Sequence, residues 1–406
     1  ENANYATFTK SGDLYCLFYE RWLEMTKKES GILCYITSNK WMRAWYGEKL
    51  RRYFSNHNPL KLIDLGSNVF SSATVDSNIL IIENCENNWK TYAMTLRNHS
   101  INLSQQMKDS TITNFSNSSS WFIWSSNENS LKIKIENSGK SLKDWGFSIN
   151  YGIKTWLNEA FIIDNITKEK ILNEDPRSWE VIKPLLRWRD IRKYRHEFSE
   201  LYIIWTFPVL NINIDSYPWI KNFLLSFWKE RLEQSGKKYP ELGFNARKKT
   251  WNAWFETQDQ ISYHNEFEKE KIMYPVMSME WSFYYDTNNF YCNDKWFIIT
   301  GSNLKYLISI LNSKITHYYL CQICSPLGNE AIEYRKIYIE TFPIPEITSD
   351  NNLIVWELET LVDKILKIRE KDIDANISDI ELLIDSLVYQ LYKLTPEEIA
   401  IIEGGK

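Results

Sequence analysis

Residues 63–83 read IDLGSNVFSSATVDSNILIIE, which is two short apolar runs joined by a polar loop. The first run ends at Leu65 and Gly66, and the second, Ile79–Ile82, is a continuous apolar run of the kind found in buried strands. One large aromatic residue, Phe70, stands inside this loop of Ser, Asn, Thr and Asp. Two interpretations are open from the residues alone. The ring folds back onto the core, since aromatic side chains favour burial, or it is a platform for a flat ligand.

The segments around this stretch alternate between helix and strand. The alternation, with continuous apolar strands, predicts an α/β fold with a largely parallel sheet, and the strands clustered around the short loop indicate an antiparallel edge. Asp13 is the expected N-cap of the first helix. The expected helices are 14–28 and about 47–55, and the expected strands are 32–37, 60–65, 78–83 and 90–97.

The rest of the chain changes character twice. Residues 98–130 begin with a segment rich in Ser, Asn and Thr and poor in large apolar groups, which predicts a linker or long loop. Residues 131–347 alternate short strand-like runs with short helices and turns, as in a mixed α+β domain. The remainder, 348–406, predicts a hairpin or small bundle of C-terminal helices, because apolar residues recur there at spacings of three and four. These helices are expected at 353–371, 377–393 and 396–403.

Composition sets broad limits. The chain has 406 residues, 44% of them hydrophobic, which is enough for two or three domains with cores. No apolar run has the length of a membrane span and no signal peptide opens the sequence, so we expect a soluble cytoplasmic protein with no membrane partner. The 18 tryptophans are several-fold more than ordinary usage.

Charge gives a local signal for nucleic acid but no global one. The net charge is −4, so bulk electrostatics do not favour a polyanionic partner. Two runs, KPLLRWRDIRKYR at 183–195 and NARKKTW at 245–251, mix cations with aromatic residues, as surfaces that hold phosphates and stack bases do. The alternative is a solvated helix face, which is how most charge runs behave.

The cysteines give little indication of a metal site. Only Cys321 and Cys324 have ligand-like spacing, and no second pair accompanies them, whereas a structural zinc site usually has four ligands. We expect free thiols and no bound metal, with zinc or redox chemistry at this pair as the alternative.

Several stretches, in this order, resemble adenine-N6 DNA methyltransferases of the TaqI type, including the fused type IIG restriction-modification enzymes. DLYCLFYERWLEM, GILCYITSNKWMRAWYGEKLR and LIDLGSNVFSSATVDSNILII, within residues 13–83, are similar to the C-terminal half of the family's Rossmann-like catalytic domain. YGIKTWLNEAFIID, VIKPLLRWRDIRKY and YRKIYIETFPIP, within 150–345, are similar to its target-recognition domain. The C-terminal IDSLVYQLYKLTPEEIAIIE also fits the family's tail.

The resemblance implies an activity and a cofactor. The family methylates a flipped-out adenine with S-adenosylmethionine, and Phe70 matches its base-stacking phenylalanine. Asn39 and Lys40 fall near the active site, or else cap a loop. The family's Asn-Pro-Pro-Tyr motif and its Gly-rich cofactor turn are not in these residues, so we expect them upstream of Glu1, with no cofactor-binding residue here. We therefore expect a C-terminal portion, in which 1–97 is the partial catalytic domain, inactive without its N-terminal catalytic region.

The resemblance also implies double-stranded DNA as partner. Arginines of the first basic run would hold phosphates or read guanine edges, and the remaining candidates match segments that lie against DNA in the family. For the patch around 248–254, a surface loop with one buried tryptophan is the alternative. The candidate DNA-binding residues are Lys154, Thr155, Asn158, Arg187, Arg189, Arg192, Lys193, Lys248, Lys249 and Trp254.

The sequence departs from the family pattern at several tryptophans. Trp156 and Trp188 stand where the family usually has glycine, and Trp281 and Trp296 replace residues that are small or lack a ring. Glycine at such places permits positive φ or close backbone approach, and an indole fills that space. Either this surface is repurposed, or the chain is altered, or some of these residue assignments are unusual.

Two other functions stay open. The chain can be a stand-alone DNA-specificity subunit that works with a separate catalytic, and in some systems nuclease-bearing, partner. It can also be an aromatic-rich carbohydrate- or protein-binding domain, which only the tryptophans favour.

Overall fold

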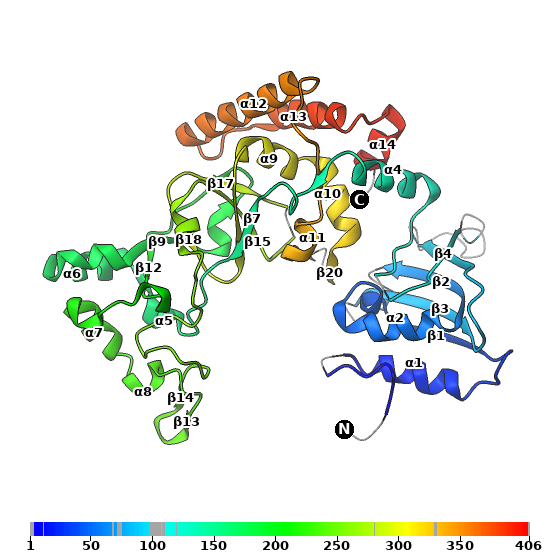
Figure 1. Cartoon of the computed structure of the whole chain (residues 1–406), viewed down its shortest axis with the longest axis horizontal. Helices are drawn as coiled ribbons and strands as arrows, with labels where there is room; N and C mark the ends of the chain where they lie inside the picture. Colours follow the sequence, from blue (N-terminus) through cyan, green and yellow to red (C-terminus); the bar gives the residue numbers. More distant parts are fainter. Residues whose placement is uncertain are drawn as a thin grey trace.

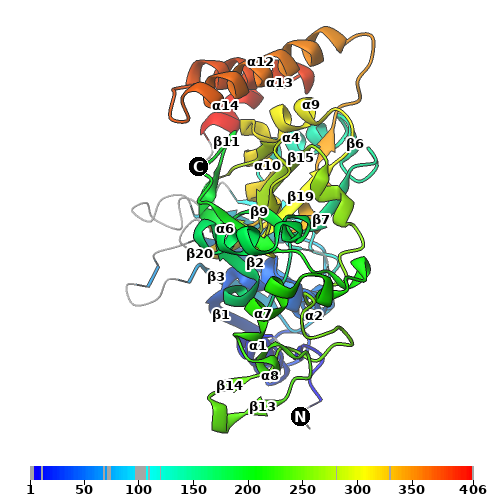
Figure 2. The same ribbon diagram turned by 90° about the vertical axis from the view of Figure 1, so that its left-hand side faces the viewer.

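The computed structural model describes residues 4–10, 12–66, 69–70, 75–96, 107, 110–118, 120–279, 281–328 and 331–404, with the backbone alone at 126, 188 and 325–328. In Figure 1 an N-terminal unit that contains a sheet and an arm of short helices lie on opposite sides of a central body. The C-terminal helices lie across the end of that body, and Figure 2 shows them far from the tip of the arm in the second view as well. No helix in the described part of the chain is both long and apolar enough to cross a membrane.

The N-terminal unit is a five-stranded sheet in the order β1-β3-β2-β4-β5, packed against two helices. Aromatic residues fill its core, where Tyr19, Trp41 and Phe54 meet edge to face. The elements are α1 (Tyr15–Glu24), β1 (Ile32–Ser38), α2 (Glu48–Ser55), β2 (Asn58–Gly66), β3 (Ser77–Glu83), β4 (Thr91–Thr95) and β5 (Thr111–Thr113).

The expectation of a largely parallel sheet is wrong for this unit. β1, β2 and β4 run in one direction, but β3 lies between β1 and β2 and runs antiparallel to both. The reason is the short connection from Gly66 to Ser77, because a parallel pair needs a crossover of a dozen or more residues. β3 is therefore a central strand and not the antiparallel edge that the sequence indicated.

Two further local expectations change. Asp13 does not cap α1: the N-cap position is Leu14, and no side chain caps the helix. The C-terminal part of the predicted linker joins the first unit, because β5 pairs with β4 and both Phe115 and Trp121 stack in its core. The bounds of the four predicted segments, 1–97, 98–130, 131–347 and 348–406, remain predictions.

The central body contains two four-stranded sheets. One is entirely antiparallel and has the order β17-β15-β19-β7, and the other has the order β18-β9-β12-β8. Their strands are β7 (Ser148–Tyr151), β8 (Ile162–Asp164), β9 (Ile182–Leu186), β12 (Leu201–Ile204), β15 (Lys271–Pro275), β17 (Tyr284–Asp286), β18 (Tyr291–Cys292) and β19 (Trp296–Thr300).

Helices cover the antiparallel sheet and continue its core outward. α9 (Leu304–Leu311) is apolar on nearly all sides, because it packs between strands β15 and β17 and helix α12. Leu358, Val362 and Ile365 of α12 complete this core. The surrounding helices are α4 (Ser126–Glu136), α10 (Lys314–Ile323), α11 (Lys336–Ile339), α12 (Asn352–Lys371), α13 (Ser378–Leu391) and α14 (Pro396–Gly404), the last three within two residues of their expected ends.

The arm is built from short elements around a small core of its own. Phe161, Ile220 and Leu224 are fully buried in it. Its elements are α5 (Asn158–Phe161), α6 (Asn165–Glu174), α7 (Pro218–Leu225), α8 (Lys229–Leu232), β13 (Lys238–Tyr239) and β14 (Phe244–Asn245).

A buried ion pair joins two strands of the antiparallel sheet. Nζ of Lys271 in β15 lies 2.5 Å from Oδ2 of Asp286 in β17, and neither side chain is exposed. The ammonium also donates to the carbonyl of Phe267, and the carboxylate accepts from the backbone N–H groups of Asn288 and Phe290. The pair is therefore hydrogen-bonded on all sides, which is the condition for tolerating a buried charge.

Lys271→Met is expected to lower the free energy of unfolding by about 3–5 kcal/mol, because it leaves the Asp286 carboxylate buried without its counter-charge. Adding Asp286→Asn to Lys271→Met should recover part of this loss. The exposed pair Lys140–Glu346 is the control, and Lys140→Met should cost about 0–1 kcal/mol. Urea unfolding measures all three, and equal losses at the two sites would contradict the assignment.

Candidate nucleic-acid interface

The ends of β1 and β2 meet at one edge of the first sheet through a buried polar contact. Asn39, which follows β1, donates from Nδ2 to Oδ1 of Asp64 in β2 at 2.9 Å. The same carboxylate accepts the backbone N–H of Gly66, whose φ is +65°. Asn39 is only 8% exposed, so its side chain braces the two strand ends and does not face solvent.

Lys40 and Asp76 stand beside this contact. The backbone N–H of Asn39 donates to the carbonyl of Asp76, which fixes the loop against the start of β3. Burial and the nearby Asp64 carboxylate raise the pKa of Asp76, while Lys40 and Arg43 act in the opposite direction. Lys40 therefore lies within electrostatic reach of the Asp76 carboxylate.

Phe70 is 46% exposed, and it follows β2 on the same edge of the sheet. Its neighbour Val69 packs instead against the cluster of Ile63, Leu65 and Met94. Val69 therefore packs on the sheet, whereas the Phe70 ring is half open to solvent. The role of this ring as a platform stays a prediction.

A buried arginine, Arg247, organises the arm. Its Nε donates to the carbonyl of Leu232 at 2.7 Å, Nη2 to that of Trp254 at 2.7 Å, and Nη1 to that of Thr155 at 3.3 Å. The guanidinium carbon also lies 4.9 Å from the centre of the Phe161 ring. Burial lowers the pKa of Arg247 to about 10, so the group stays charged at neutral pH.

These three hydrogen bonds, which we call the Arg247 fork, bring two predicted DNA-binding segments together. Lys154 and Lys248 both lower the pKa of Asp259, which burial raises, so both ammonium groups act electrostatically on the same carboxylate. Lys154 also lies 5.1 Å from the ring centre of Trp156, whose side chain is 51% exposed. Lys248 and Lys249 are exposed. We name this surface, made of residues 154–158 and 245–259, the arm surface.

The other predicted residues of the arm surface have structural contacts. Thr155 is buried and donates from Oγ1 to Oδ1 of Asn158, which begins α5 and is itself exposed. Trp254 is half-buried, packs on the arm core and meets Phe255 edge to face. Thr155 and Trp254 therefore support the surface, and Asn158 lies on it.

The first basic run is largely engaged within the protein. Arg187 forms two hydrogen bonds to Asp190, and Lys193 lies 2.7 Å from Glu381 of α13. Arg192 donates to the backbone carbonyls of Arg189 and Ile191. The side chains of Arg189 and Arg192 are exposed. The structure does not bring this run together with Lys154 and Lys248 in any contact among the described residues.

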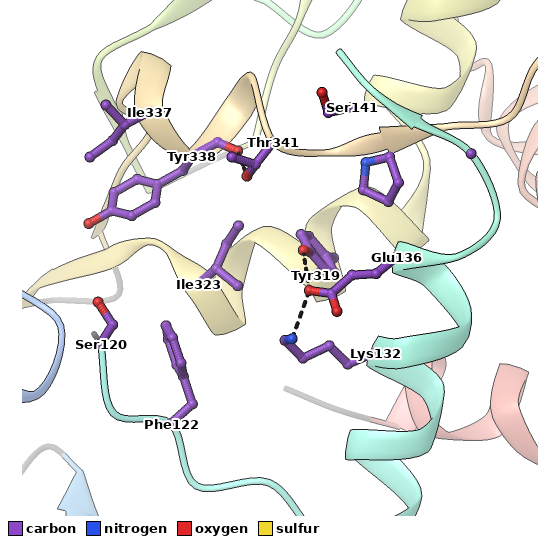
Figure 3. Close-up of a pocket in the computed structure, with 12 residues that line it drawn as sticks. Ser120, Phe122, Lys132, Glu136, Ser141, Tyr319, Ile323, Ile337, Tyr338 and Thr341 are labelled. Atoms are coloured by element: carbon purple, nitrogen blue, oxygen red, sulfur yellow. Dashed lines mark hydrogen bonds and ion pairs between the residues drawn. The ribbon is translucent and has the colours of Figure 1, made fainter. Parts of the chain in front are cut away.

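Two pockets lie outside the arm surface. The larger, of about 490 Å³, is lined by Ser120 and Phe122 from the N-terminal unit and by residues of α4, α10 and α11. In Figure 3 the Glu136 carboxylate turns into it but is already bound by Lys132 at 2.7 Å and by the Tyr319 hydroxyl at 3.0 Å. The smaller, of about 300 Å³, includes Arg192 and Lys193.

The cysteine pair is divided between two environments. Cys321 lies in α10 and is partly exposed, whereas Cys324 follows the helix and is buried. Burial raises the pKa of the Cys321 thiol to about 11, which keeps it protonated at neutral pH. Within the described ranges no group of three His, Cys, Asp or Glu side chains is arranged to hold a metal ion.

Reasoning from the sequence missed Arg247 and its counterpart Arg51. Arg51 is buried in the N-terminal unit, where its guanidinium donates to the carbonyls of Trp41, Ala44 and Ser118. Both arginines bind backbone carbonyls of distant segments, so their role depends on tertiary contacts. Arg247 stands in a basic run that also fits a solvated surface, and Arg51 lies within helix α2, so neither position marks its buried role in the sequence.

Comparison with known proteins gives two family matches within the chain. Residues 1–70 match the Eco57I restriction-modification methylase, and residues 183–344 match the TaqI-like C-terminal specificity domain. The chain is 23% identical over 429 residues to the type II methyltransferase M.BstVI of Geobacillus stearothermophilus, covering 99% of this chain and 71% of that protein. The resemblance to type II restriction-modification methyltransferases is thereby confirmed.

One solved structure extends this similarity to the fold. The type IIL restriction-modification enzyme MmeI, solved in complex with DNA, matches 96% of this chain and 51% of its own with a TM-score of 0.57 and 11% identity. The type IIG restriction endonuclease BpuSI matches 97% of this chain and 50% of its own, with a TM-score of 0.38 and 12% identity. The chain spans about half the length of these two proteins.

Arg247→Met is expected to lower the free energy of unfolding by about 3 kcal/mol, because it removes charged hydrogen bonds and leaves three carbonyls without a donor. Amide hydrogens of residues 245–257 should exchange faster, since the fork fixes this loop. Lys249→Met, at an exposed position of the same loop, should change stability by about 0.5 kcal/mol or less. Unchanged exchange in Arg247→Met would show that the fork does not hold the loop.

Proposed function

We propose that this chain, which resembles type II restriction-modification methyltransferases, supplies target recognition and part of the base-flipping pocket of a site-specific adenine-N6 DNA methyltransferase. The observation that carries this proposal is the presence, in one chain and in this order, of a methylase segment and a TaqI-like specificity segment. The fold similarity to MmeI, which was solved with DNA, supports duplex DNA as the partner.

The arm surface is the part that we assign to DNA. It presents Lys154, Lys248 and Lys249 with the exposed amide of Asn158 on a scaffold fixed by Arg247. Fixed cations of this kind attract phosphates and release counter-ions, which gives affinity that falls with salt. Arg189 and Arg192 are exposed and available for further phosphate or base contacts, whereas Arg187 and Lys193 serve ion pairs within the protein.

Phe70 is assigned to the flipped base. An adenine inside the duplex hides its exocyclic nitrogen, so the base must leave the stack before any chemistry. An exposed aromatic ring at the end of β2 can stack on it, which is worth about 1–3 kcal/mol per base. Asn39 acts as a positioning residue, since its hydrogen bond to Asp64 holds the strand ends that flank the loop. Lys40 supplies a positive charge at the same edge.

We infer that the described residues do not complete a site for S-adenosylmethionine. Asn39, Asp64 and Asn78 are buried at the edge of the sheet, where Asn39 donates to Asp64 and Trp41 donates to Asn78, which leaves Asn39 Oδ1 and Asn78 Nδ2 without a partner. The sequence contains no Asn-Pro-Pro-Tyr motif. We assign the cofactor, which brings the methyl group, and this motif to a catalytic region outside these residues, on the same polypeptide or on a separate subunit.

Because the cofactor site is assigned to another region, the 406 residues alone are expected to transfer no methyl group to duplex DNA in the presence of S-adenosylmethionine. A filter assay with tritiated cofactor measures it, using a complete adenine methyltransferase as the positive control. Methylation by the isolated chain would contradict the assignment of the cofactor site to another region.

Binding of a mixed-sequence duplex is expected to weaken steeply between low and moderate salt, because phosphate contacts dominate such affinity. Lys154→Gln/Lys248→Gln/Lys249→Gln should reduce affinity at low salt at least tenfold. It should also reduce the slope of log affinity against log salt by about one for each phosphate that the variant no longer binds. Fluorescence anisotropy of a labelled duplex measures both quantities.

The matched control is Lys364→Gln/Lys367→Gln, two exposed lysines of α12 on the C-terminal helices. This variant also removes positive charge, but away from the arm surface, and should bind nearly as the unmodified chain does. An equal loss in both variants would mean that net charge, and not the arm surface, sets the affinity.

A further inference from the structure

Tryptophan and glycine occur in unusual numbers in this chain. There are 18 tryptophans and 13 glycines among 406 residues. Ordinary usage would place glycine at about 7%, or roughly 28 residues in a chain of this length. Glycine is therefore short by nearly as many residues as tryptophan is in excess, and the two together number 31.

Three tryptophans have backbone conformations that favour glycine. The φ angles of Trp89, Trp156 and Trp228 are +63°, +59° and +71°. Trp228 combines this φ with a ψ of 120°, which is outside the left-handed helical region that other residues occasionally enter. Of the eleven described non-glycine residues with positive φ, tryptophan supplies three, as many as asparagine, which tolerates this conformation far better.

The same three side chains leave about half of their surface exposed to solvent. Trp89, Trp156 and Trp228 are 46%, 51% and 57% exposed. Other tryptophans of the chain are locked in place: Trp41 is fully buried and donates to Asn78, and Trp121 is buried and stacks on Phe115. Trp89, Trp156 and Trp228 therefore differ from the core tryptophans, because they occupy strained and open positions.

Family resemblance identifies an overlapping set independently. Trp156 and Trp188 stand where TaqI-type recognition domains usually carry glycine. Trp156 belongs to both sets, so the backbone angle explains the family's preference at that position.

We propose that Trp89, Trp156, Trp188 and Trp228 are glycine in the protein as its own cell makes it, because their codon is UGA and the cell translates UGA as glycine. UGA differs by one base from the tryptophan codon UGG and by one base from the glycine codon GGA, and different bacterial translation systems assign it to stop, tryptophan or glycine. One reassigned codon accounts for the backbone angles at these positions and for part of the tryptophan excess and the glycine deficit.

This identity bears on the arm surface, and here the inference rests on the proposed function. Trp156 lies between Lys154 and Asn158, with Lys154 over its ring, so an indole occupies the space in which a phosphate would reach that ammonium. Glycine at 156 frees Lys154 and lets the DNA backbone approach the chain closely.

The direct test is peptide mass spectrometry of the protein purified from its natural source. Peptides that contain positions 89, 156, 188 and 228 should have the mass of glycine, while those with Trp41 and Trp121 should have the mass of tryptophan. Tryptophan at all four positions would overturn the inference. Because the spectrum measures residue identity alone, its outcome is independent of whether the chain binds DNA.

A second test uses purified variants. The quadruple variant Trp89→Gly/Trp156→Gly/Trp188→Gly/Trp228→Gly should have a higher Tm than the tryptophan form and bind the labelled duplex more tightly. Trp356→Gly is the matched control, because Trp356 is 62% exposed in helix α12, where glycine should lower Tm. A lower Tm in the quadruple variant would overturn the inference, whereas a higher Tm without tighter binding would leave it standing and count against the arm surface.

Discussion

The guanidinium of Arg247 is the interaction on which the arm depends. It joins the end of α8, the segment before α5 and the loop that follows β14, by hydrogen bonds to Leu232, Thr155 and Trp254. Nearly a hundred residues separate Thr155 from Trp254, so no local preference could hold them together. A planar fork with fixed donor directions suits three backbone carbonyls better than a lysine would. The exposed lysines acquire a defined arrangement only because the loop beneath them is fixed.

The N-terminal unit uses the same device for a different surface. Arg51 binds the carbonyls of Trp41, Ala44 and Ser118, and so fixes the segment that leaves β1 against the segment that follows β5. The hydrogen bond between Asn39 and Asp64 then aligns the ends of β1 and β2, next to the exposed ring of Phe70. In both units a buried polar group fixes a loop, and with it the arrangement of the residues that the loop exposes.

Much of the secondary structure was predictable, because strands β1, β2 and β3 are continuous apolar runs and α12 and α13 repeat apolar residues at helical spacing. The position of β3 was mispredicted: the sequence indicated an antiparallel edge, whereas β3 lies between β1 and β2, and the composition of a strand does not show which strands it will pair with. The DNA-binding role of the candidate residues stays a prediction. Their contacts within the protein were predictable only in part, since Lys193 pairs with Glu381 of a helix almost two hundred residues away. Such pairing depends on the tertiary fold and leaves no local pattern in the sequence.

The central claim is that the arm surface is where this chain meets DNA, and photo-cross-linking tests it most directly. A duplex carrying 5-bromouracil would be irradiated with the chain, and the cross-linked peptides identified by mass spectrometry. Cross-links are expected within residues 154–158 and 245–259. Cross-links confined to α12 and α13, or spread evenly over exposed lysines, would contradict this claim.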